Sequence, residues 1–142
     1  MIETVTYARD PRNVQQARRF VGARLAGQPP QLVDRTILMV SELVTNSLRH
    51  ASGPIMLTLE VTDDALRVAV GDDGPSKPIV RNPSPEEMSG RGLRIVSALA
   101  DEWGVSSDED SRNIVWFCLT LKAQEPSDMS ERDREGATGG SQ

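Results

Sequence analysis

Hydrophobic and polar positions alternate at the start of the chain and then recur at helical spacing. Residues 2–7 alternate and are rich in strand-favouring residues, which predicts a short first strand. Asp10 and Pro11 then form a pair typical of a helix start, because Asp accepts bonds from free first-turn amides and Pro has no amide hydrogen to lose. The apolar positions that follow predict an amphipathic helix ending near Gly27; they are Val14, Ala17, Val21 and Leu25.

A second amphipathic helix is predicted over residues 32–51, after the chain is broken at Gln28-Pro29-Pro30. Its apolar stripe consists of Ile37, Val40, Val44 and Leu48. Two alternating runs follow, over residues 55–61 and 66–70, with a short polar turn between them. This arrangement predicts a β-hairpin.

The second half of the chain is predicted to contain a long loop, a third helix and two further strands. Residues 74–89 are rich in proline and lack apolar periodicity, so they are expected to form a loop, and loops of this length are usually functional or mobile. The third helix is expected from Gly92, with Leu93, Val96, Leu99 and Trp103 on one face. Strands are expected from Val105 and over residues 115–121, with both Trp103 and Trp116 in the core.

Helices and strands in this order predict an α+β fold, a two-layer sandwich in which a mostly antiparallel sheet carries helices on one face. We expect one domain over residues 1–122. Residues 123–142 are rich in Ser, Gly, Glu and Asp, which predicts a disordered tail.

Composition and charge narrow the function classes. The chain has 142 residues and a net charge of -5, which argues against a protein that coats nucleic acid, since such binding needs clustered Lys and Arg. We see no apolar stretch long enough to span a bilayer and no secretory pattern at the N-terminus, so we expect a cytoplasmic protein without a membrane partner. With a single cysteine, Cys118, and a single histidine, His50, any metal is expected to arrive with a substrate.

Polar side chains interrupt the second predicted helix at Glu42, Asn46, Arg49 and His50. Glu42 and Asn46 are four residues apart and therefore lie on one face of a helix, with Arg49 and His50 following one turn later. Taken alone, this pattern also suits a solvated polar stripe.

Two further stretches carry candidate chemistry. A predicted strand runs into Asp72-Asp73-Gly74-Pro75, where an ordinary turn is the alternative but where a carboxylate can be rigidly held. Gly90 and Gly92 open the third predicted helix, whose free amide groups favour an anion such as phosphate; a flexible hinge is the alternative there.

Three ordered segments, ELVTNSLRHA, VAVGDDGP and GRGLRIVSALADEWGV, resemble the N box and the two glycine boxes of the GHKL ATPase fold shared by gyrase, histidine kinases and MutL. In amino-acid sequence and size they most resemble bacterial anti-sigma factor serine/threonine kinases. The resemblance covers roughly residues 7–121, and three boxes in one short chain are more specific than any one of them.

The resemblance implies that the site binds ATP and Mg²⁺. Asn46 would coordinate the metal through its side-chain oxygen, which is a hard ligand. Glu42 would lie beside the terminal phosphate as the general base or would position water. Asp72 would accept the adenine amino group, and Gly74 would leave room for the base.

The same resemblance places the remaining cofactor-binding residues around the phosphates. Gly90, Arg91, Gly92 and Leu93 would border them, and Arg49 could contact phosphate or pair with a nearby acid. His50 is more often structural at such a position. Residues 76–89 would form the lid that closes over the nucleotide.

Two positions depart from the family pattern. Ser76 stands where the family often has a second glycine. Ile114 stands near the last strand, where many relatives carry a Thr whose hydroxyl helps to hold the adenine-bound water.

Three functions are compatible with these features. The leading hypothesis is a regulator that captures a sigma factor and phosphorylates Ser or Thr on an anti-sigma factor antagonist of the STAS type, in a homodimer and without direct contact to nucleic acid. The second is a binding module that uses nucleotide only to set its shape, which Ser76 and Ile114 favour. The third, the catalytic domain of a sensor histidine kinase, fits poorly because we see no dimerising helix with a phosphoacceptor His before the N box.

Overall fold

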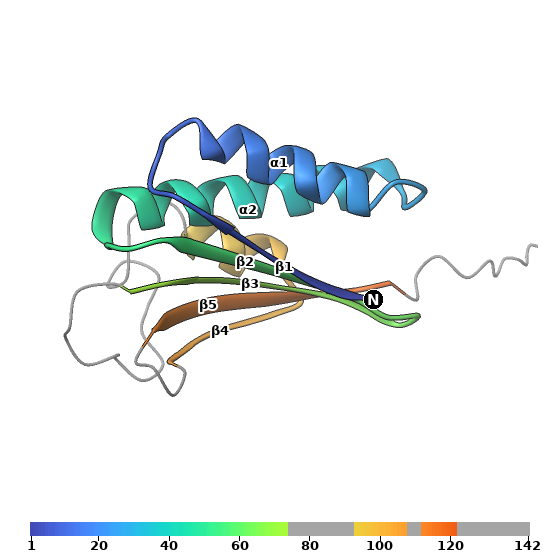
Figure 1. The fold of residues 1–142 in the computed structure, drawn as a ribbon. Coiled ribbons are helices and arrows are strands. Elements are labelled where there is room, and N and C mark those ends of the chain that lie inside the picture. Colours follow the sequence, from blue (N-terminus) through green and yellow to red (C-terminus); the bar gives the residue numbers. More distant parts are fainter. Residues whose placement is uncertain (74–92, 108–111, 122–142) are drawn as a thin grey trace, which may run out of the picture.

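The fold, taken from a computed structural model, is a five-stranded sheet with helices on one face (Figure 1). The structure describes residues 1–73, 93–107 and 112–121. The elements are β1 (Ile2–Tyr7), α1 (Asn13–Arg24), α2 (Pro30–His50), β2 (Ile55–Val61), β3 (Ala65–Asp72), a helical segment at residues 93–99, β4 (Glu102–Ser107) and β5 (Asn113–Thr120). The strand order is β1-β2-β3-β5-β4 and every pair is antiparallel, which confirms the predicted α+β sandwich.

The core lies between the helices and one face of the sheet. Val68 of β3 is paired with Phe117 of β5, and both side chains are fully buried on the helix-covered face. From α2, Met39, Val40 and Val44 are likewise fully buried, at the helical spacing that the sequence shows. Within the described residues, no helix is long and apolar enough to cross a membrane.

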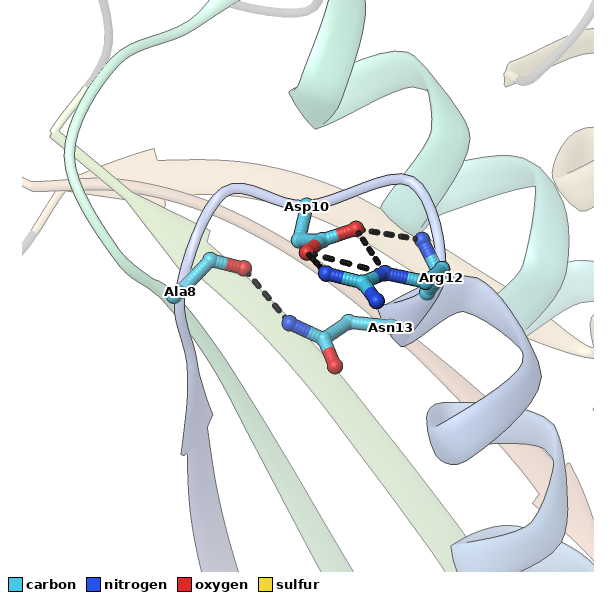
Figure 2. A network of polar contacts seen from close by, with 4 residues as sticks. All are labelled: Ala8, Asp10, Arg12 and Asn13. Carbon is cyan, nitrogen blue, oxygen red and sulfur yellow. Dashed lines mark hydrogen bonds and ion pairs between the residues drawn. The ribbon is translucent and has the colours of Figure 1, made fainter.

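The first helix begins at Asn13, slightly later than Asp10 and Pro11 predict. Asp10 nevertheless organises this start (Figure 2): its Oδ1 accepts the Arg12 backbone N–H at 2.9 Å, and its carboxylate also accepts the Arg12 guanidinium. The hydrogen bonds from Arg12 lower the pKa of Asp10 to about 2. Asn13 donates its side-chain amide to the Ala8 carbonyl at 2.8 Å, so the turn is held from both sides.

The prediction that Trp103 lies on the third helix is wrong. The helical segment ends at residue 99, and Trp103 belongs to β4, which begins at Glu102 rather than Val105. The chain leaves the helix and begins to pair with β5 at Asp101. The Asp101 N–H donates to the Cys118 carbonyl at 3.0 Å, and its carboxylate accepts the Thr120 N–H at 2.7 Å. Trp103 still packs partly against the core.

The prediction that Trp116 is a core residue is also wrong. Its neighbours Val115 and Phe117 face the helices, so strand alternation places Trp116 on the opposite face of the sheet. There its ring covers Gly104, where a Cβ would lie 2.8 Å from a ring carbon, and the Arg67 guanidinium carbon lies 4.9 Å from the ring centroid. A cation stacked on an indole suits this half-exposed position.

The predicted lid at residues 76–89 and the predicted tail at residues 123–142 lie outside the described residues. Both remain predictions, as do the domain boundaries.

Two leucines of α2 give a matched test of this packing. Leu43 is 3% exposed and Leu38 is 41% exposed. We expect Leu43→Ala to lower the free energy of unfolding by about 2 to 5 kcal/mol, because it leaves a cavity in the core. Leu38→Ala should cost less than about 1 kcal/mol. Urea denaturation at pH 7 measures both; equal losses would mean that α2 packs through a different face.

Candidate functional site

The C-terminal half of α2 carries the polar residues that the sequence singles out. Glu42 and Asn46 are half-buried and lie one turn apart on the helix. Arg49 and His50 end the helix and are exposed.

Asp72, the last residue of β3, meets this end of α2. Its Oδ2 accepts a hydrogen bond from the Ser47 hydroxyl at 2.6 Å, although 25 residues separate the two along the chain. Its Oδ1 is buried and accepts no hydrogen bond from the described part of the chain. The structure therefore brings together Asp72 and the end of α2 that carries Asn46, and one carboxylate oxygen has no hydrogen-bond partner among the described residues.

The carboxylate is held in a partly desolvated position. Burial raises the pKa of Asp72 above its ordinary value, and the Ser47 hydrogen bond opposes that increase. Asn113, paired with Asp72 across β3 and β5, and the charge of Arg9 also lower the pKa, whereas the neighbouring Asp73 raises it.

Sequence reasoning missed Ser47, although a signal was present. Ser47 follows Met39, Val40, Leu43 and Val44 at helical spacing on the buried side of α2, and it is 4% exposed. The other buried polar side chain among the described residues, Thr36, donates to the Leu32 carbonyl of its own helix, whereas Ser47 donates across to β3. A serine on a buried stripe needs a partner, and that requirement could have identified it.

Arg9 was also missed, and no local pattern marks it. It lies between β1 and α1, and its Nη2 donates to the carbonyl oxygens of Ser47 and Leu48, both at 2.6 Å. Its Nη1 donates to the Gly53 carbonyl at 3.3 Å. A cation at the last carbonyls of a helix is favourable because these groups lack intrahelical partners and carry the negative end of the helix dipole.

The turn after α2 completes the frame of the site. Gly53 has φ +73°, a left-handed conformation that glycine adopts at little cost, and a Cβ there would collide with the Asp73 carboxylate. The Asp73 N–H donates to the Ser52 carbonyl at 3.1 Å. The end of β3 is therefore tied to the α2–β2 turn by backbone as well as by side chain.

The third predicted segment is described only from Leu93 onward. Leu93 is buried in the core and is the first residue of the described helical segment. Gly74, Gly90, Arg91 and Gly92 lie outside the described residues, and their contact with a nucleotide remains a prediction.

The described residues suit a ligand that donates a hydrogen bond into the buried end of the site. An amino group is such a donor, and Asp72 Oδ1 is an acceptor that needs one. No group of three or more His, Cys, Asp or Glu side chains is placed to hold a metal within residues 1–73, 93–107 and 112–121. The side-chain oxygen of the half-buried Asn46 is a hard donor, which fits a magnesium ion that takes most of its ligands from phosphate and water.

A comparison with protein-family models shows which family the chain belongs to. The model of the histidine kinase-like ATPase domain matches residues 7–119, which include α2, β3 and the segment after residue 90. The chain belongs to the histidine kinase-like ATPase domain family. Membership in a family of ATPase domains implies that this domain binds ATP.

Solved structures show the same fold. The RsbU and RsbW domains of Rv1364c from Mycobacterium tuberculosis match with a TM-score of 0.67 and 17% identity, over 85% of this chain and 32% of that chain. The histidine kinase domain of the blue-light activated histidine kinase from Erythrobacter litoralis EL346 matches with a TM-score of 0.54 and 26% identity, over 80% of this chain and 62% of that chain. The ATPase domain thus spans less than two thirds of either protein. No curated protein matches the chain significantly.

Replacing the half-buried Asp72 carboxylate tests the electrostatics of the site. Because the pKa of Asp72 is raised in the folded state, the folded state binds this proton more tightly, and stability is lost as pH rises from the ordinary pKa through the raised one. Asp72→Asn removes this loss while still accepting the Ser47 hydrogen bond. We expect the variant to match wild type near pH 3 and to be more stable near pH 7.

Urea denaturation at the two pH values measures the difference. Asp63→Asn, in the exposed turn after β2, is the control and should change stability by less than about 0.5 kcal/mol at both. An Asp72→Asn variant that loses stability relative to wild type between pH 3 and pH 7 would contradict the desolvated carboxylate.

Proposed function

We propose that this ATPase domain is a protein kinase of the anti-sigma factor type, which transfers the terminal phosphoryl group of ATP to Ser or Thr of a partner protein. The observation that supports it is the buried Asp72 Oδ1, because it offers an acceptor for the adenine amino group at the end of the helix that carries Asn46 and Glu42. A hydrogen bond to a charged acceptor contributes about 1.5 to 3 kcal/mol.

The order of residues along α2 supports this assignment. Ser47 contacts the carboxylate that would hold the base. Toward the helix N-terminus, the next residue is Asn46, the proposed metal ligand, and Glu42 lies four residues before Asn46. With a rise of about 1.5 Å per residue, Glu42 is about 6 Å beyond Asn46 along the axis. Base, metal and terminal phosphate would therefore follow one another along the helix.

The chemistry requires mainly positioning and charge neutralisation. Magnesium, when bound, would neutralise charge on the phosphates, and Asn46 would hold it. Glu42 would accept the proton of the attacking hydroxyl. Arg49 is exposed at the end of α2 and would contact phosphate, with Gly74, Gly90, Arg91, Gly92 and Leu93 around the nucleotide.

The proposed partners are a sigma factor and a STAS-type antagonist. The three sequence boxes and the fold shared with the RsbU and RsbW domains support them. Phosphorylation would release the antagonist by charge repulsion and desolvation cost, so that the sigma factor stays held. We further propose a cytoplasmic homodimer without direct nucleic-acid contact.

A second candidate function is a nucleotide-dependent binding module without kinase turnover. Ile114 favours it: this residue is paired with Gly71 next to Asp72 and supplies no hydroxyl to a base-bound water.

Glu42 distinguishes the two candidates. We expect Glu42→Gln to slow label transfer from γ-labelled ATP to a candidate STAS-type antagonist by about 100-fold or more, because the general base is lost. ATP affinity should change by less than about threefold, since Glu42 would not hold the base. Glu60→Gln, on the uncovered sheet face, is the control and should transfer label normally. Absence of label transfer by the wild type, with ATP still bound, would leave the binding-module function. Retained transfer in the Glu42 variant would mean that Glu42 is not the general base.

Replacing Asn46 tests whether its side chain binds magnesium. Calorimetric titration with ATP should show affinity falling by about tenfold when magnesium is removed with EDTA. In Asn46→Ala, affinity should hardly depend on magnesium, whereas Asn46→Asp should keep the dependence because a carboxylate is also a hard ligand. A magnesium dependence that persists in Asn46→Ala would place the metal elsewhere.

A further inference from the structure

We propose that Arg9 and Ser47 are positioning residues that orient the Asp72 carboxylate so that Oδ1 accepts the amino group of the base, and that they thereby set a preference for 6-amino over 6-oxo purine nucleotides. The inference rests on the proposed ATP site and adds two residues to it. Arg9 lies outside the three sequence boxes, and Ser47 lies within the N box, where the resemblance gives it no role.

Ser47 fixes which carboxylate oxygen meets the ligand. A hydroxyl has one hydrogen to donate, and Ser47 donates it to Oδ2 at 2.6 Å. Oδ2 is thereby held against α2, and rotation of the carboxylate would break this bond. Oδ1 is buried and accepts nothing from the described residues, so it is the acceptor left for a ligand.

Arg9 fixes the place of Ser47. Its guanidinium binds the carbonyl oxygens of Ser47 and Leu48 at 2.6 Å each and that of Gly53 at 3.3 Å, so it holds the last turn of α2 and the turn that follows. The Ser47 carbonyl also accepts the Ala51 N–H at 3.0 Å. Arg9 comes from a different part of the chain, the connection between β1 and α1.

Arg9 also affects Asp72 electrostatically. Among the described residues, the charged groups that act on this carboxylate are Arg9, which favours its ionised form, and Asp73, which opposes it. Ser47 from α2 and Asn113 from β5 contribute uncharged polar groups. Arg9 is therefore the positive charge that offsets part of the cost of burying an ionised Asp72.

This geometry favours an amino group at position 6 of a purine. The amino group of adenine donates a hydrogen bond to Oδ1. The 6-oxo oxygen of hypoxanthine is an acceptor, so neither it nor Asp72 Oδ1 would gain a hydrogen bond. A site built around a hydrogen bond rejects such an analogue.

Calorimetry with ATP and ITP measures the preference. Wild type should bind ATP at least about tenfold more tightly than ITP. Ser47→Ala and Arg9→Gln should lower this ratio by about threefold or more, mainly by weakening ATP. Ser47→Thr keeps the hydroxyl and should restore the ratio, and Arg12→Gln, on the same connection but exposed and paired with Asp10, should leave it unchanged.

A second readout needs no nucleotide. In the ligand-free protein, the ¹³C shift of the Asp72 carboxyl group reports its pKa, which should move further upward in Ser47→Ala and Arg9→Gln but not in Arg12→Gln. If circular dichroism shows that Arg9→Gln does not fold, Arg9→Lys takes its place. The lysine keeps the positive charge but not the contact with three carbonyl oxygens. Arg9→Lys should therefore lower the ratio of ATP affinity to ITP affinity, and it should move the Asp72 pKa less than Ser47→Ala does.

The two readouts separate this proposal from the proposed function. If wild type binds ATP but Ser47→Ala and the folded Arg9 variant keep the wild-type ATP:ITP ratio, the positioning role is overturned. If the Asp72 pKa moves as expected but wild type binds neither nucleotide, Arg9 and Ser47 position the carboxylate and the ATP site is what fails. An Asp72 pKa that stays at its wild-type value in Ser47→Ala overturns the positioning role independently of any ligand.

Discussion

The hydrogen bond between the Ser47 hydroxyl and the Asp72 carboxylate is the contact on which the site depends. It joins the end of α2 to the end of β3, two elements that the sheet and the core hold in place independently. A half-buried carboxylate with a raised pKa is unfavourable for folding alone, and one partner on Oδ2 compensates for only part of its lost hydration. The other oxygen stays without a partner among the described residues, which is a cost that a ligand donor can remove.

The surrounding structure makes this arrangement rigid. Arg9 closes the last turn of α2, and the left-handed Gly53 lets the Asp73 carboxylate pack against the α2–β2 turn. The backbone bond from Asp73 to Ser52 adds a link that does not depend on side chains. A carboxylate anchored on a strand end and a helix end is held more closely than one on a loop would be, and such pre-organisation is what selective binding of a base requires.

Much of the fold could be predicted because hydrophobic periodicity reports which face of each element is buried. Glu42 and Asn46 were identifiable because they interrupt an otherwise apolar helix. Trp103 was misplaced because apolar residues at helical spacing run past the true helix end, where pairing of Asp101 with β5 decides the outcome. Trp116 was misplaced because an aromatic residue in a strand suits either face. Arg9 could not be found, since its partners are backbone carbonyls distant in sequence, which leave no trace in local pattern.

The central claim is that the end of α2 and the end of β3 form one site in which Asp72 Oδ1 receives the base of ATP. A crystal structure of the ATPase domain with magnesium and a non-hydrolysable ATP analogue tests it most directly. The account predicts the adenine amino nitrogen within hydrogen-bond distance of Asp72 Oδ1, about 2.7 to 3.2 Å, with the Ser47 bond to Oδ2 preserved. A nucleotide whose base lies away from Asp72, or a carboxylate turned away from Ser47 in the complex, would contradict it.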